Sequence, residues 1–165
     1  MIIQQGLHFR PVRRNEMATV PLVVQDSRYK TIISATFTGT MANATQGEIL
    51  DISDMTGWVS ATLSKTNLAQ VSWSCSTPIQ LIWTGTTPKT ALHLNGNGMY
   101  GGSNGMPAIP NTAAGGTDLG DLHMISAAAS VGYVVCVFHK VTNAQGFGWT
   151  WTDAELGPPQ NEFGG

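Results

Sequence analysis

Three features of this 165-residue sequence predict an all-β fold, a single-domain antiparallel β-sandwich that is jelly-roll-like. Short segments in which apolar and polar residues alternate recur along the chain, and turns rich in Gly, Pro, Asn and Asp separate them. No segment of useful length has the 3.6-residue apolar period of a helix. The length suits one domain, because a chain of about 150 residues hides roughly 70% of its unfolded surface.

The first half of the chain carries the clearest strand patterns, beginning at residue 18. In residues 31–38, the side chains of Thr31, Ile33, Ala35 and Phe37 share one face. Shorter runs predict further strands at residues 48–52, 58–64, 71–75, 79–84 and 90–94. We therefore expect a succession of short strands joined by turns.

Residues 95–121 have a different composition, rich in Gly, Asn and Pro, with neither the strand nor the helix period. The sequence predicts one long loop here. Loops of this length are uncommon inside compact domains and are usually functional or at an interface. Glycine also allows a segment to follow the surface of a neighbour closely.

The last strands are predicted after this loop. Residues 122–129 fit a strand, although the alanine run also fits a helical turn. Residues 131–141 are apolar on both faces over most of their length, which indicates a central strand covered on both sides.

A hairpin is expected around residues 143–152, with Phe147, Trp149 and Trp151 on one face. Such an aromatic stripe fits three roles: part of the sandwich core, part of a subunit interface, or a platform on which sugars stack.

Charge is scarce and unevenly placed. Charged residues make up 11% of the chain, whereas about 25% is usual. Either partners cover much of the surface, or the protein works where neutral polar surfaces are tolerated. Residues 1–30 contain five basic and two acidic residues, and residues 118–165 contain one basic and five acidic residues. Copies of the chain could therefore pair head to tail, although solvated charge without a partner explains the tail equally well.

We divide the chain into an extended N-terminal arm at residues 1–17, a β-sandwich domain at 18–152, and a flexible or draped tail at 153–165. The arm contains Pro11 and the basic residues Arg10, Arg13 and Arg14. It lacks the apolar run of a signal peptide, so we expect synthesis in the cytoplasm. No apolar run approaches the ~18 residues of a membrane span.

No catalytic pattern stands out, and we expect a protein that is not an enzyme and needs no cofactor or metal. The pairs Asp51/Asp54 and Asp118/Asp121 could serve calcium binding or glycoside hydrolysis, but Asp is above all a turn residue. The histidines are scattered, and the glycine runs lack the GK[ST] ending of a phosphate loop. Cys75 and Cys136 are interpreted as small buried residues, with a disulfide left open.

The segments ANATQGEILDIS, GWVSATLSK and LHLNGNGMYGGSNGMPAIPN, within a Thr/Ser/Gly/Asn-rich β chain, resemble structural proteins of tailed-bacteriophage virions. The nearest likeness is to capsid decoration, or cement, proteins, and it covers roughly residues 1–150 as a style of sequence. This resemblance implies a virion protein on the outer capsid surface that stabilises the shell by clamping neighbouring major capsid protein subunits. It also implies a homo-oligomer, with a trimer favoured, and no direct DNA contact is expected.

The arm and the long loop are the natural clamping segments under this hypothesis. The candidate partner interface consists of Arg10, Arg13, Arg14, Met99, Tyr100, Met106, Ile109, Trp149 and Trp151. The alternative is a carbohydrate-binding receptor-recognition or tail-accessory module that uses Trp149 and Trp151 as its platform.

Overall fold

The computed structural model describes residues 18–60, 64–102, 105–114, 118–141 and 149. The expectations for the arm at 1–17 and the tail at 153–165 concern residues outside these ranges.

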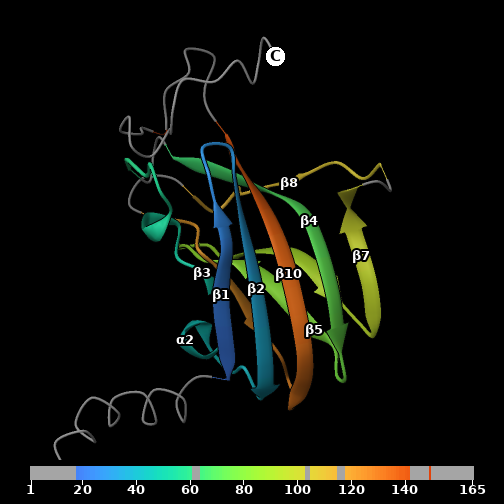
Figure 1. The fold of residues 1–165 in the computed structure, drawn as a ribbon. Coiled ribbons are helices and arrows are strands. Elements are labelled where there is room, and N and C mark those ends of the chain that lie inside the picture. Colours follow the sequence, from blue (N-terminus) through green and yellow to red (C-terminus); the bar gives the residue numbers. More distant parts are fainter. Residues whose placement is uncertain (1–17, 61–63, 103–104, 115–117, 142–148, 150–165) are drawn as a thin grey trace, which may run out of the picture.

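Two antiparallel sheets form the domain (Figure 1). Sheet A contains, in spatial order, β1 (Thr19–Asp26), β2 (Lys30–Gly39), β10 (Ser130–Val141), β4 (Lys65–Cys75) and β7 (Asn97–Gly101), with the short β8 (Ile109–Pro110) beside β4. Sheet B contains β3 (Glu48–Leu50), β9 (Leu122–Ile125), β5 (Ile79–Trp83) and β6 (Lys89–Leu94). The short helix α2 (Ala44–Gly47) precedes β3, and the 3-10 turn η1 (Ile52–Asp54) follows it.

The strand pairing is nested along the sequence. β2 pairs with β10, β3 with β9, β4 with β7, and β5 with β6, and all four pairs are antiparallel. The chain from β2 to β10 thus folds back on itself as one long hairpin, which rolls up so that successive pairs fall in alternate sheets. This connectivity is the jelly roll that the sequence predicted.

The core lies between the sheets and is built from the alternation seen in the sequence. Thr31, Ile33, Ala35 and Phe37 on β2 are all buried, as their shared face predicted. Across the core, the rings of Trp83 and Phe138 meet edge to face with their centroids 6.2 Å apart. This contact joins sheet B to the centre of sheet A. Cys75 and Cys136 are buried free thiols, which confirms their predicted burial and leaves them unpaired.

The predicted loop at residues 95–121 is wrong in part, because it contains strands β7 and β8. The prediction failed here because the glycines were interpreted as loop residues. Gly98 lies against the ring of Trp73, and Gly101 lies against the main-chain carbonyl of Ala69, so these positions bring β7 close to β4. In β7 the glycines allow the strand to pack closely against β4.

The strand predicted at residues 58–64 is not found in its described part. The hydroxyl of Ser64 accepts hydrogen bonds from the amides of Val59 and Ser60, and the Ser64 amide donates to the Ser60 carbonyl. A serine side chain that satisfies the local backbone in this way competes with strand pairing. Trp58 keeps a single antiparallel bridge, to Trp149.

Candidate interaction surfaces

The outer face of sheet A is a continuous surface of uncharged side chains across five neighbouring strands. We define it by the side chains that alternate with the core residues along five strands. They are Val20 and Leu22 on β1; Ile32, Ser34, Thr36 and Thr38 on β2; Val131, Tyr133, Val135 and Val137 on β10; Gln70, Ser72 and Ser74 on β4; and Asn97 and Met99 on β7. None of these residues carries a charge.

Several large apolar side chains on this outer face are open to solvent. Leu22 is 65% exposed, Val131 56% and Tyr133 38%, and Met99 is also exposed. The charged residues Lys30 and Lys65 occur only at one end of the face, opposite His139 and Val141 on β10. The face is therefore a neutral, partly apolar plane bordered by basic groups at one end.

The strand β10 confirms one half of its prediction. It lies between β2 and β4, at the centre of sheet A, and its inward residues Val134, Cys136 and Phe138 are fully buried. The other half is not met, because no described residue covers Val131 and Tyr133 on the outward side. The sequence of β10 is typical of a strand covered on both faces, but described residues cover only its inward face.

The β1 edge of sheet A is protected against pairing with another strand at Pro21. The Thr38 amide donates to the Ala18 carbonyl, so by the alternation of an antiparallel ladder Val20 and Leu22 also bond to β2. Pro21 then faces its main chain outward, where it has no N–H to offer a partner. The outer face of sheet A is therefore a better candidate for a contact than this edge.

The four predicted interface residues of the 95–121 segment differ in their exposure to solvent. Met99 lies on the outer face of sheet A, and Met106 is exposed beyond β7. Tyr100 points toward the core and donates its hydroxyl to the Pro107 carbonyl at 2.8 Å, while Ile109 packs against the core from β8. Met99 and Met106 are exposed, whereas Tyr100 and Ile109 are partly buried against the core.

Trp149 is part of the core, which agrees with the first of the three roles considered for the aromatic stripe. It is 3% exposed, and its indole N–H donates to the Lys65 carbonyl at 3.1 Å. A side chain so covered offers neither a protein partner nor a sugar a surface, so its assignment to the interface is corrected. Trp151, Arg10, Arg13 and Arg14 lie outside the described residues.

The buried side chain of Lys140 lies beside Trp149 and is paired with Asp26. Its ammonium lies 5.1 Å from the centre of the Trp149 ring, 2.7 Å from the Asp26 carboxylate and 2.6 Å from the Thr56 carbonyl. Burial alone would raise the pKa of Asp26, but the hydrogen bonds from Lys140, Thr56 and Thr31 lower it below its usual value. This ion pair joins β10 to the end of β1.

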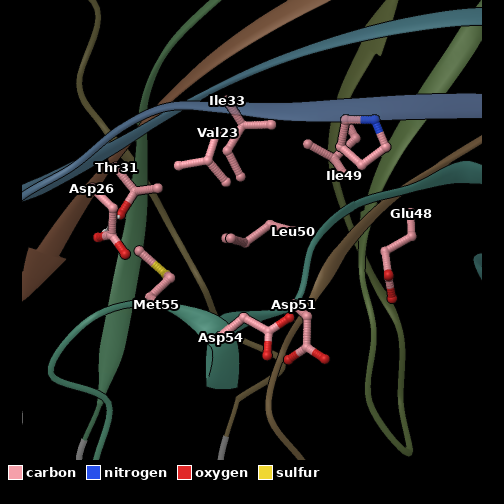
Figure 2. Close-up of a pocket in the computed structure, with 11 residues that line it drawn as sticks. Val23, Asp26, Thr31, Ile33, Glu48, Ile49, Leu50, Asp51, Asp54 and Met55 are labelled. Atoms are coloured by element: carbon pink, nitrogen blue, oxygen red, sulfur yellow. Dashed lines mark hydrogen bonds between the residues drawn. The ribbon is translucent and has the colours of Figure 1, made fainter.

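A cleft of about 150 Å³ opens where β1 and β3 part at the edge of the two sheets (Figure 2). Its floor is apolar and comprises Pro21, Val23, Ile33, Ile49, Leu50 and Met55. The side opposite β1 carries Glu48, Asp51 and Asp54, as Figure 2 shows. We call this feature the edge cleft.

The carboxylates around the edge cleft differ in how they are satisfied. Asp51 caps η1, because it accepts from the amide and the hydroxyl of Ser53, and this confirms its predicted turn role. Among the residues that the structure describes, none donates a hydrogen bond to the side-chain carboxylate of Glu48 or Asp54. Burial and then the charges of Asp51 and Asp54 raise the pKa of Glu48. The cleft thus carries negative charge that its own lining does not neutralise.

Asp118 and Asp121, the second predicted turn pair, hold segments together over long distances. Asp118 accepts from the amide and hydroxyl of Thr86, and Asp121 accepts from the Ile52 amide at 2.8 Å. Neither bond is local, since each spans more than thirty residues of chain. These carboxylates serve the fold.

Within the described ranges, no group of three or more His, Cys, Asp or Glu residues is arranged to hold a metal ion. No helix in the described part of the chain is long and apolar enough to cross a membrane. No family model, curated protein or solved structure matches the chain, so these surfaces are interpreted from their own chemistry.

Proposed function

We propose that this chain is a structural subunit of a larger protein shell, and that it attaches through the outer face of sheet A. The observation that carries the proposal is the open, uncharged face over β10, whose sequence is apolar on both sides. A free-standing monomer would be expected to place charge there.

The outer face is large enough to form much of a protein interface. Five strands about 4.8 Å apart, with a mean length of about nine residues at ~3.3 Å per residue, give roughly 600 Å² of sheet plane. This plane is of the same order as the ~800 Å² of accessible area that each partner buries in a standard interface. The mixture of Val, Leu, Tyr and Met with small hydroxyl residues suits such a contact.

Within this class, we propose the role of a capsid decoration protein that bridges neighbouring major capsid protein subunits. Its support is the resemblance of the sequence to decoration proteins of tailed phages and the jelly-roll connectivity, which is common in capsid proteins but also in lectins. The carbohydrate-binding alternative loses the part of its platform that Trp149 would have supplied.

The test is incorporation into particles. We expect the double variant Val131→Lys/Tyr133→Lys, produced in place of the normal chain, to be at least about tenfold depleted from purified particles, because two charges would be buried unpaired. The matched control is Thr90→Lys, an exposed position on β6 of sheet B. Circular dichroism establishes that both variants fold. Incorporation of the double variant at the normal level contradicts the proposal.

A further inference from the structure

The edge cleft has the chemistry of a docking site for a basic and apolar peptide. Its apolar floor belongs to β1, β2 and β3 and to Met55, and its rim presents the carboxylates of Glu48 and Asp54. No lysine or arginine belongs to its lining. Asp26, the fourth acidic residue there, is already paired with Lys140.

The cleft has room for one ring. The cleft volume of about 150 Å³ equals that of an apolar cavity that accommodates benzene, and the floor of the cleft is apolar although its rim is acidic. A ring seated there would add apolar contact to the charge attraction at the rim, and an aromatic anchor beside arginine is a frequent combination at binding hot spots.

One segment of this chain carries the complementary chemistry. Residues 7–14 read LHFRPVRR, so that Phe9 stands next to Arg10 and precedes Arg13 and Arg14. Phe9 is the only Phe, Tyr or Trp in residues 1–17, and the first acidic residue of the chain is Glu16. The segment ends at Arg14, a few residues before Pro21 on β1, and Pro21 lines the cleft.

The direction of β1 favours docking of this segment from another molecule over docking of the same chain's own segment. β1 begins at Thr19 and runs past the cleft toward Asp26, so an extended chain before Thr19 leads away from it. At ~3.3 Å per residue, a fully extended stretch of the eight or so residues between Arg10 and Thr19 would span at most roughly 25 Å. A return to the same cleft would require a reversal within the few residues before Thr19.

We propose that residues 7–14 of a second copy of this chain dock in the edge cleft, with Phe9 on its apolar floor and the arginines facing Glu48 and Asp54. The inference rests on the proposed assembly function and names one contact between copies. Since each copy would give an arm and receive another, the contact is heterologous and can close a ring.

The experiment exchanges the charges of the two partners in the full chain. The cleft variant is Glu48→Lys/Asp54→Lys, and the arm variant is Arg10→Glu/Arg13→Glu/Arg14→Glu. Asp26 and Asp51 stay unchanged because they hold the fold together. The control is Lys89→Glu, an exposed position on β6 outside the cleft lining. Light scattering after size exclusion measures association of each protein and of a one-to-one mixture.

We expect each variant alone to associate at least about tenfold more weakly than the normal chain, and the mixture to recover association. The neutral pair Glu48→Gln/Asp54→Asn should weaken association without the strain of added lysines. A mixture that stays as dissociated as its components, as an arm docked in its own cleft predicts, overturns the inference. So does undiminished association of the cleft variant. Either result leaves the incorporation test of the outer face unaffected.

Discussion

At the scale of single residues, Asp121 has the most strongly shifted pKa among the described carboxyl groups. Its burial raises the pKa to about 6, the hydrogen bond from Ile52 opposes this, and Asp51, Glu48 and Asp54 add to the rise. Between about pH 4 and 6, the folded protein therefore holds a proton that the unfolded chain releases. Stability from this group is present at low pH and is lost as the pH rises through about 6.

Replacing Asp121 with Asn should remove that pH dependence. The variant keeps an acceptor for the Ile52 amide and loses the repulsion. We expect its free energy of unfolding to exceed that of the normal chain at pH 7 by about 1 kcal/mol, after allowance for solvent screening, and to equal it near pH 4. Urea unfolding at both pH values measures this. An identical pH dependence in both proteins would show that Asp121 does not titrate differently on folding.

Residue roles were predictable from the sequence where they depend on local chemistry. Asp51 serves its turn, and Cys75 and Cys136 fill the core, as their residue types indicated. Asp121 was assigned to a turn and instead binds the backbone sixty-nine residues away. Such a partner depends on how the sheets close over each other, which no local pattern records.

At the scale of elements, Gly101 on β7 lies against an irregularity in the neighbouring strand β4. The pairing of β10 with β4 skips Ala69 between Leu68 and Gln70, which leaves the Ala69 carbonyl facing Gly101. Gly101 also has a φ of +83°, which favours glycine. The site needs glycine for both reasons.

Substitution of Gly101 by Ala should lower the free energy of unfolding by about 2–4 kcal/mol, because a Cβ would overlap the Ala69 carbonyl and the backbone would be strained. Gly96→Ala is the matched control. Gly96 has a φ of +61° but open space around it, so we expect a loss of only about 1 kcal/mol. Thermal or urea unfolding compares the two. Equal losses would mean that backbone conformation alone, and not the close approach to β4, requires Gly101.

Element prediction succeeded where alternation was regular and failed where glycine or serine had a second use. β2, β5 and β6 lie where their apolar patterns placed them. β7 was missed because its glycines read as loop signals, although they serve contact with Trp73 and Ala69. The segment after Trp58 alternates like a strand, yet its serines bond to their own backbone.

At the scale of the whole molecule, the jelly roll was predictable as a class because the number and spacing of short strands suit it. The interaction surface was only partly predictable. The apolar outer half of residues 131–141 indicated a covered face, but no described residue covers Val131 and Tyr133. Val20 and Leu22 were missed because which side of β1 faces the core depends on its pairing with β2.

The most direct test of the central claim is to image the particle that contains this chain at a resolution that separates β-strands. The account predicts that the outer face of sheet A, at Leu22, Val131 and Tyr133, lies against a neighbouring subunit. The opposite outcome, a particle in which this face remains open to solvent while the molecule attaches through sheet B, would contradict it.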